Sequence, residues 1–496
     1  MTPAEHTRRS SHWRSLQAVL AGSLFSGATL TLGSSAVGSP LLLLGVPLVL
    51  GAGVLLMLWP AVAFMLTAFI IPIERLGRLT ADDAMYTISL MRIVGTLALG
   101  SFLLHALIRR RSIAFGSAFW LYAAYFCLAL LGVFHSSHQL GTVRACGAIL
   151  GNLLFFWLVI NIAQAPRLAK TAVALWLTST VIVGVFTIIT WHFGKGVSEA
   201  DLGETASRFS TVMVDTSEWE ALDSTARAAG PTSHAAVYAM NLILTLPFFL
   251  YFLKHQRGTG WRVLIVGGLL VTMYNVFLTN TRAAILLAVA VLLLCGARGL
   301  YRFSAGGVVV ALLAVAAMLP LAPEAVWHRV LDTSNYSLER SATLRIRFEY
   351  WAAGLQVAQD HWLAGIGVGN QQVIPLYIKG DAPEETTVHN EYIMTAMEVG
   401  LLGWGVFFGF VALMYAAARR AAQLVPGRWP PGLLHADFFV AAQVAMLATA
   451  IYGLQVDVFH FPLKGWWLIA GISWALYRVL LEEKPIQVHH SERSAQ

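Results

Sequence analysis

The chain has 496 residues, of which 57% are hydrophobic, and its mean hydropathy is +0.67. Only 12% of the residues are charged, whereas soluble globular proteins carry about 25%, so the composition excludes an ordinary soluble domain. Apolar stretches long enough to cross a bilayer recur along the chain. We therefore predict an all-α fold, in the form of a polytopic integral membrane protein.

Fourteen stretches are predicted to span the membrane. The first is interpreted as a retained helix, because no convincing signal-peptide cleavage site follows it. The second and third are interrupted at Trp59-Pro60, so we expect twelve to fourteen helices. In chain order the stretches are 15–34, 40–57, 58–73, 86–108, 115–134, 143–163, 168–191, 233–253, 261–278, 282–297, 304–321, 391–418, 435–456 and 462–481.

The distribution of basic residues predicts the orientation of the chain. If the N-terminus lies in the cytoplasm and the spans alternate, the short inner loops hold most of the arginines and lysines, including the triplet at 109–111 and the pair at 419–420. This is the positive-inside pattern, and it predicts that both termini are cytoplasmic. The net charge of +7 then reflects topology and anionic membrane lipids, and it does not indicate nucleic-acid binding.

Two polar segments are too long for ordinary connections, and both are predicted to lie on the outer side. Loops longer than about 15 residues are usually functional or disordered. These segments divide the chain into N-terminal helices (1–191), a first outer loop (192–232), central helices (233–321), a large outer loop (322–390) and C-terminal helices with a cytoplasmic tail (391–496).

The large outer loop contains a predicted amphipathic helix within "SATLRIRFEYWAAGLQVAQ". Apolar side chains recur there at helical spacing, while Arg345 and Arg347 lie on the other face, so we expect the helix to lie at the membrane surface. The apolar positions are Leu344, Phe348, Trp351 and Leu355. The following "GIGVGN" is interpreted as a turn, because no strand precedes it and no phosphate-binding lysine follows it.

His389 stands at the start of a predicted span, in "VHNEYIMTAMEVGLLG". A neutral imidazole near pH 7 is suited to act as a general base. The alternative is a histidine that caps the helix or lies at the membrane interface. The spacing of the sequence alone does not decide between these two interpretations.

Arginines precede two other predicted spans on the same side. Arg282 follows Thr279, Asn280 and Thr281, which offer capping groups, and a guanidinium beside helix N-terminal amides favours a phosphate group. The alternative for Arg282 is an arginine that extends to the interface. Arg227 precedes "GPTSH"; it is either an anion-binding or a solvated residue.

Together these residues favour one chemistry, which is glycosyl transfer from a polyprenyl diphosphate carrier at the outer leaflet. Fixed guanidinium groups would stabilise the negative charge that develops on the departing diphosphate. A histidine would accept the proton of the attacking hydroxyl. The outer segments show no His/Cys cluster with metal-ligand spacing, so we expect neither a metal nor another cofactor.

Three motifs resemble those of the O-antigen ligase and polymerase superfamily, over roughly 227–403. "HNEYIMTAMEVGLLG" resembles its H-N-x-Y/F…E-x-G-L-x-G signature, and "LTNTRAAILL" its T-x-S-R segment. "RIRFEYWAAGLQVAQDHWLAGIGVGN" resembles its R-x-x-x-W…G-x-G-N segment. The sequence departs from the family at three positions, where Thr281 replaces serine, Trp362 replaces proline, and "GPTSH" follows Arg227 instead of Pro-Asn.

The resemblance implies a metal-independent, inverting glycosyltransferase of a bacterial inner membrane with its active site in the periplasm. His389 would be the base, and Arg282 and Arg227 would bind the diphosphate, with Arg208 as a competitor for the second role. Arg347 would support either function. Arg345 and Asn390 complete the set of expected substrate-binding residues.

The expected activity is that of an O-antigen ligase, which transfers O-polysaccharide from undecaprenyl diphosphate to lipid A-core among the membrane lipids. An O-antigen or exopolysaccharide polymerase and a protein O-oligosaccharide ligase share this donor chemistry and stay open. An anion transporter is the alternative from another class, kept open by Arg92 within a predicted span.

Overall fold

The computed structural model describes residues 51–73, 89–110, 112–193, 227–302, 342–378 and 387–483, with the exception of 233, 431, 458 and 460–462. These residues form helices joined by short connections and contain no β-strand. The prediction of an all-α, polytopic membrane protein is therefore confirmed. Seven described helices are long and apolar enough to cross a membrane, and an eighth span results if one bent pair is counted as a single crossing.

The helix bounds agree with the predicted spans to within a few residues, apart from the C-terminal part of the chain. The predicted spans 15–34 and 304–321 lie outside the described residues, so the total of twelve to fourteen helices stays a prediction. The described helices of more than ten residues are α3 (Pro60–Ile70), α4 (Leu90–Ile108), α5 (Ser117–Leu131), α6 (Gln139–Ile162), α7 (Pro166–Phe193), α10 (Thr259–Leu278), α11 (Arg282–Ala297), α14 (Ala342–Asp360), α15 (Glu391–Arg428), α16 (Ala436–Tyr452) and α17 (Lys464–Glu482).

The chain divides into two compact units. The smaller unit comprises 1–67 and 92–113 and contains most of α4. Its helix Gly51–Leu58 ends just before Trp59, and the next helix, Pro60–Ile73, begins in this unit at an angle of 114° to the first. The interruption predicted at Trp59-Pro60 is therefore present, because proline cannot donate the backbone hydrogen bond that would continue the first helix.

The larger unit comprises 68–91 and 114–496. At its centre lie two short helices, α8 (Ala235–Ile243) and α9 (Leu246–His255), which form one almost completely buried span. The helix α10 packs against α7, α8 and α9, while α16 packs against α9, α11 and α15. The helices α5, α6 and α17 complete the bundle beside α15.

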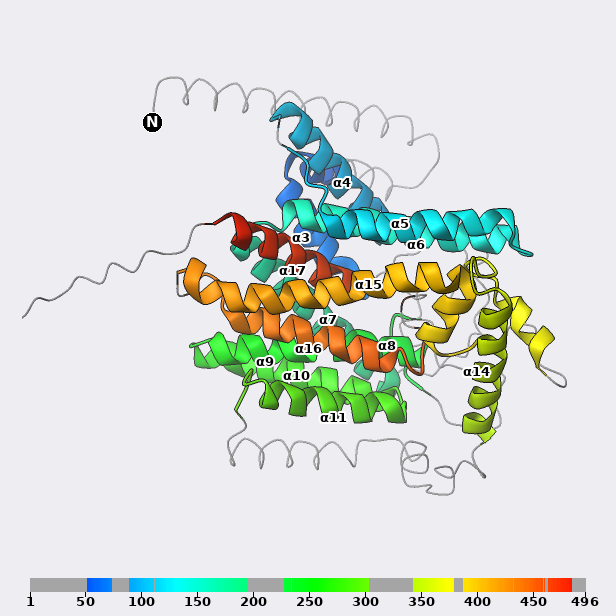
Figure 1. Cartoon of the computed structure of the whole chain (residues 1–496). Coiled ribbons are helices and arrows are strands. Elements are labelled where there is room, and N and C mark those ends of the chain that lie inside the picture. Colours follow the sequence, from blue (N-terminus) through cyan, green and yellow to red (C-terminus); the bar gives the residue numbers. More distant parts are fainter. Residues whose placement is uncertain are drawn as a thin grey trace, which may run out of the picture. The chain divides into compact units, whose positions relative to one another are not determined.

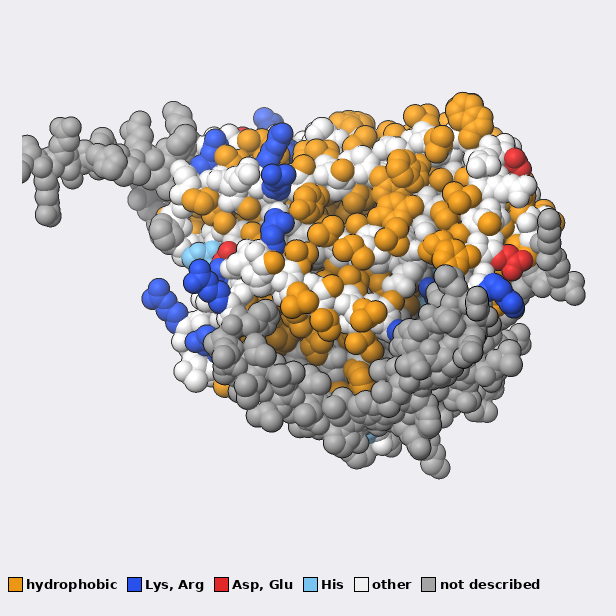
Figure 2. All heavy atoms as spheres, turned by 60° about the horizontal axis from the view of Figure 1, so that its bottom comes forward, with side chains coloured by type: hydrophobic (Ala, Val, Ile, Leu, Met, Phe, Trp, Pro, Cys, Tyr) orange, Lys and Arg blue, Asp and Glu red, His pale blue; other side chains and the backbone are white. Residues whose placement is uncertain are grey.

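The outward-facing side chains of the bundle are apolar, as expected for contact with lipid. On α10 and α11, Trp261, Leu264, Leu286 and Leu293 are each more than 60% exposed. Figure 2 shows hydrophobic side chains across the middle of the visible face, with most of the visible lysine and arginine side chains on its left and a few on its right. An apolar middle between charged edges is typical of a protein that crosses a bilayer.

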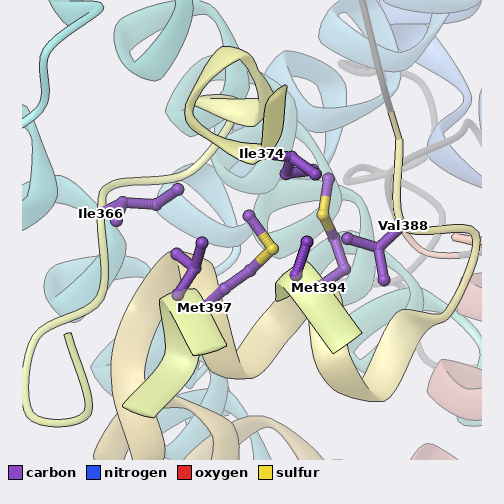
Figure 3. Packing of buried hydrophobic residues seen from close by; sticks show 7 residues of the cluster. Ile366, Ile374, Val388, Met394 and Met397 are labelled. Carbon is purple, nitrogen blue, oxygen red and sulfur yellow. The ribbon is translucent and has the colours of Figure 1, made fainter. Parts of the chain in front are cut away.

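The helix α14 crosses the end of α15 rather than running alongside it (Figure 1). Its buried side chains Ala353 and Val357 join a cluster with Val388, Met394 and Met397 at the start of α15 (Figure 3). The predicted helix is therefore present. Trp351 of its predicted apolar stripe packs against this cluster, whereas Phe348 and Leu355 of the same stripe are about half exposed.

The helix α15 is interrupted at Gly400, which adopts φ 68° and ψ −179°. The break leaves the carbonyl groups of Met397 and Glu398 without helical partners, and they accept hydrogen bonds from Ile366 N–H (2.8 Å) and Gly367 N–H (2.9 Å). The turn predicted at "GIGVGN" thus donates the hydrogen bonds that these two carbonyl groups of the interrupted helix accept. The expectation of one continuous helix over 391–418 was wrong, because the segment is broken at Gly400 and extends to Arg428.

Replacement of Gly400 by alanine is expected to lower the free energy of unfolding by about 3 kcal/mol or more. The backbone conformation is essentially restricted to glycine, and an added Cβ would lie 2.4 Å from the carbonyl oxygen of Leu363. Gly405→Ala on the same helix is the matched control, because nothing lies within 4 Å of its Cβ position. Chemical unfolding in detergent measures both, and equal stability of the two variants would contradict the expectation.

Candidate active site

His389 lies immediately before α15 in a left-handed backbone conformation, with φ 50°. The cap of the helix is the next residue, Asn390, whose Oδ1 accepts hydrogen bonds from the N–H groups of Tyr392 (3.0 Å) and Ile393 (3.2 Å). The alternative interpretation of His389 as the capping residue is therefore wrong. The Thr387 hydroxyl lies 3.1 Å from Nδ1 and 3.0 Å from Nε2 of the imidazole.

Burial lowers the pKa of His389 to about 4, and the nearby charges of Arg347 and His234 act in the same direction. The imidazole is consequently neutral at physiological pH and can accept a proton. A negatively charged ligand beside Arg347 would offset the effect of the guanidinium and raise the pKa of His389. The site therefore combines an unprotonated base with a local excess of positive charge.

The depressed pKa of His389 predicts a dependence of stability on pH. The unfolded chain binds a proton near pH 6.5, whereas the folded chain binds it only near pH 4, so stability is lost as the pH falls through this interval. The loss attributable to this residue should approach about 3 kcal/mol at pH 4. Unfolding measured from pH 7 to pH 4 should show a smaller loss for His389→Gln than for the wild-type protein. Identical pH profiles of stability would contradict this assignment.

Arg347 is supplied by α14, and the cluster in Figure 3 holds that helix over the start of α15. Burial lowers the pKa of Arg347; Tyr452 and Asp457 oppose this effect, while Arg227 adds to it. Three segments that are distant in sequence thus bring charged groups to one location. Close approach of α14 depends on Gly354, since a Cβ there would lie 2.8 Å from Cγ2 of Ile393.

A backbone hydrogen bond holds the segment with Arg227 close to the segment that leads to Arg282. The N–H of Ala228 donates to the carbonyl oxygen of Leu278 at 3.1 Å, so the segment with Arg227 lies against the end of α10, four residues before Arg282. Ala228, Leu278 and Tyr274 form a buried cluster there. The first turns of α8, α11 and α15 lie at the same end of the larger unit, beside α14 (Figure 1).

The start of α11 differs from the predicted capping arrangement. Thr281 occupies the N-cap position without a side-chain cap hydrogen bond, because its hydroxyl donates to the Thr279 carbonyl oxygen (3.1 Å). Asn280 is 1% exposed with φ 48°, and neither of its amide atoms has a hydrogen-bond partner among the described residues. The first turn of α11 therefore presents Arg282 next to amide groups that the Thr281 side chain does not cap.

The remaining expected site residues differ in position. Arg345 is exposed on α14. Asn390 is 5% exposed and, besides capping α15, its Nδ2 donates to the Leu454 carbonyl oxygen (3.1 Å). Arg208 lies outside the described residues. The structure thus places Arg347 near both His389 and Arg227. The segment that carries Arg227 is bonded to the end of α10, just before Arg282. Asn390 caps α15 directly after His389.

Several neighbours of the site were not singled out in the sequence. His234 was noted only as part of a departure from the family motif, although its Nδ1 accepts from the Ala236 N–H at 3.2 Å at the start of α8. Asp457 is 3% exposed between α16 and α17, and Tyr452 donates through its hydroxyl to the Ala236 carbonyl oxygen at 3.2 Å. An acidic residue between two apolar spans was the signal available for Asp457.

Within the described part of the chain, no three His, Cys, Asp or Glu side chains are grouped as metal ligands. The polar groups at the site are instead guanidinium, imidazole, phenol and a buried carboxylate. Such a set can bind an anionic group through the arginines and can accept a proton at the imidazole.

The family model described as O-antigen ligase matches residues 267–408. This range contains Arg282, α14 with Arg347, the turn that docks at Gly400, and His389. No curated protein matches the chain. Members of this family are glycosyltransferase-like enzymes that act on glycans. Over 267–408 the chain is therefore similar to the O-antigen ligase family, and this match supports the resemblance seen in the sequence motifs.

Proposed function

We propose that the protein is an O-antigen ligase, which transfers O-polysaccharide from undecaprenyl diphosphate to a sugar hydroxyl of lipid A-core. The observation that carries this proposal is a neutral His389 beside Arg347, on which the charge of Arg227 also acts, with the Arg227 segment bonded to the end of α10 just before Arg282 through the Ala228–Leu278 hydrogen bond. The proposed location is the bacterial inner membrane, with the site facing the periplasm. The positive-inside pattern of the sequence supports this orientation.

In the proposed reaction the acceptor hydroxyl loses its proton to the free imidazole nitrogen of His389. The resulting oxygen attacks the anomeric carbon from the side opposite the diphosphate, which inverts the configuration. The bond between the anomeric carbon and the diphosphate oxygen breaks, and its electron pair leaves with the diphosphate. Arg282, Arg227 and Arg347 stabilise that charge where little water competes. No metal ion takes part in the proposed reaction.

Purified protein in nanodiscs, supplied with carrier-linked glycan and lipid A-core, tests this function. The expected result is glycan-capped lipid A-core, formed equally well in the presence of a chelator. Transfer in detergent micelles, which enclose no compartment, would exclude a transporter. Elongation of carrier-linked repeats, or transfer only to a protein acceptor, would replace the ligase proposal with one of the two related activities.

Arg347→Lys is expected to lower kcat by roughly tenfold to one hundredfold, because an ammonium group cannot reproduce the planar, bidentate contact of a guanidinium. Arg262→Lys is the matched control, since Arg262 is an exposed arginine at the start of α10 to which no role in the reaction is assigned. Initial rates of transfer by the two purified variants measure the difference. Equal rates would remove Arg347 from the proposed diphosphate contacts.

A further inference from the structure

Three consecutive residues after His389 attach the start of α15 to the end of α16 and the segment that follows it. Asn390 Nδ2 donates to the Leu454 carbonyl oxygen (3.1 Å), and the Glu391 N–H donates to that of Gly453 (2.8 Å). The Tyr392 hydroxyl donates to the Ala450 carbonyl oxygen (2.8 Å). The position of His389 is therefore tied to this one neighbouring segment.

The side chain of Glu391 adds an attachment at the far end of the same segment. Its Oε2 accepts a hydrogen bond from the Phe459 N–H (2.9 Å), and its Oε1 accepts one from the Thr395 hydroxyl (3.2 Å). Glu391 is only 2% exposed. A buried carboxylate is costly unless its oxygens accept hydrogen bonds, and here both oxygens do so.

The two attachments of Glu391 bracket Asp457. The backbone of Glu391 holds Gly453 and its carboxylate holds Phe459, so the 453–459 segment is fixed on both sides of the buried Asp457 side chain. The charge of Asp457 acts on Arg347, which in turn acts on His389. A shift of the 453–459 segment would therefore change the surroundings of both the proposed base and an arginine beside it.

We propose that Glu391 is a positioning residue for the transfer reaction, whose carboxylate holds the 453–459 segment against the first turn of α15, directly after His389. This inference rests on the proposed function. Glu391 does not touch the substrates; it acts through the placement of Asp457 and His389. A displacement of about 1 Å in such a site can lower the rate by roughly one hundredfold.

Glu391→Asp and Glu391→Gln test the proposal. The aspartate is one methylene shorter and cannot reach the Phe459 N–H from the same backbone position. The glutamine has the same length, but its neutral oxygen accepts a hydrogen bond about half as strong. We expect kcat to fall by about tenfold or more for Glu391→Asp and by less for Glu391→Gln, with KM for both substrates within about twofold of wild type. Glu349→Asp, an exposed carboxylate on α14, is the matched control.

Hydrogen exchange in nanodiscs gives a second readout that does not depend on activity. Glu391→Asp should increase deuterium uptake at Phe459 by about tenfold or more in rate, because the charged hydrogen bond to its N–H is lost. If Glu391→Asp folds and has the kcat of the wild-type protein, the positioning role is wrong. If Glu391→Asp does not fold, a wild-type kcat in Glu391→Gln leads to the same conclusion. If the wild-type protein transfers no glycan but Glu391→Asp still increases exchange at Phe459, the proposed function is wrong. The structural role of Glu391 in holding the 453–459 segment would still be supported.

Discussion

Replacement of His389 by alanine is expected to abolish detectable glycan transfer while the protein remains folded and inserted. A positioned general base contributes about 10²- to 10⁴-fold to a rate, and the neutral imidazole is the proton acceptor of the proposed reaction. The fold should tolerate the change, because the cap of α15 is supplied by Asn390 rather than by His389. Transfer assayed with the purified variant in nanodiscs measures the loss.

His361→Ala is the control for this variant, since His361 is an exposed histidine just after α14. Its activity should equal that of the wild-type protein. The elution profile of each variant in size-exclusion chromatography reports whether the fold is retained. A folded His389→Ala variant that keeps more than about one tenth of the wild-type rate would exclude His389 as the base.

Arg282→Lys is expected to lower transfer by about 10²- to 10³-fold, the range found when one donor to a developing negative charge is removed. Lysine keeps the charge but presents a compact ammonium instead of a planar fork, so a two-point contact with the diphosphate is lost. The loss should appear in kcat more than in KM, because the charge on the leaving group develops in the transition state.

The same substitution at the other end of α11 provides the comparison. Arg298 donates to the Gln443 side-chain oxygen at 2.6 Å, away from the start of the helix. Arg298→Lys should leave kcat within about twofold of the wild-type value, since it lies a whole helix length from Arg282. Near-normal turnover by Arg282→Lys would argue against a bidentate contact with the donor.

The helices of this protein were largely predictable because lipid imposes a simple pattern, in which about twenty apolar residues form each crossing. The bounds of α10 and α11 and the interruption at Trp59-Pro60 follow from such local signals. The break at Gly400 was not predictable in this way. Its carbonyl groups are satisfied by N–H groups of the 365–370 turn, and a contact between segments 30 residues apart leaves no periodic trace in the sequence.

The candidate site was predictable where a motif or a helix end marks it. His389, Arg282 and Arg227 each precede an apolar helix, and Arg347 lies in an amphipathic pattern. Asp457, His234 and Glu391 were not singled out, because their proximity to the site depends on how α8, α15 and α16 pack. The carboxylate of Glu391, for example, accepts a hydrogen bond from Phe459 N–H, which lies 68 residues further along the chain.

The interrupted helix has a consequence for how the proposed substrates would reach the site. The turn after α14 supplies N–H groups to the carbonyl groups at Met397 and Glu398, and Gly369 N–H donates to the Glu398 carboxylate (2.8 Å). Sliding α14 away would strand these acceptors in apolar surroundings, which is costly. We therefore expect α14 and the first turns of α15 to move together as a rigid body. Any movement that admits the substrates should then occur in other segments.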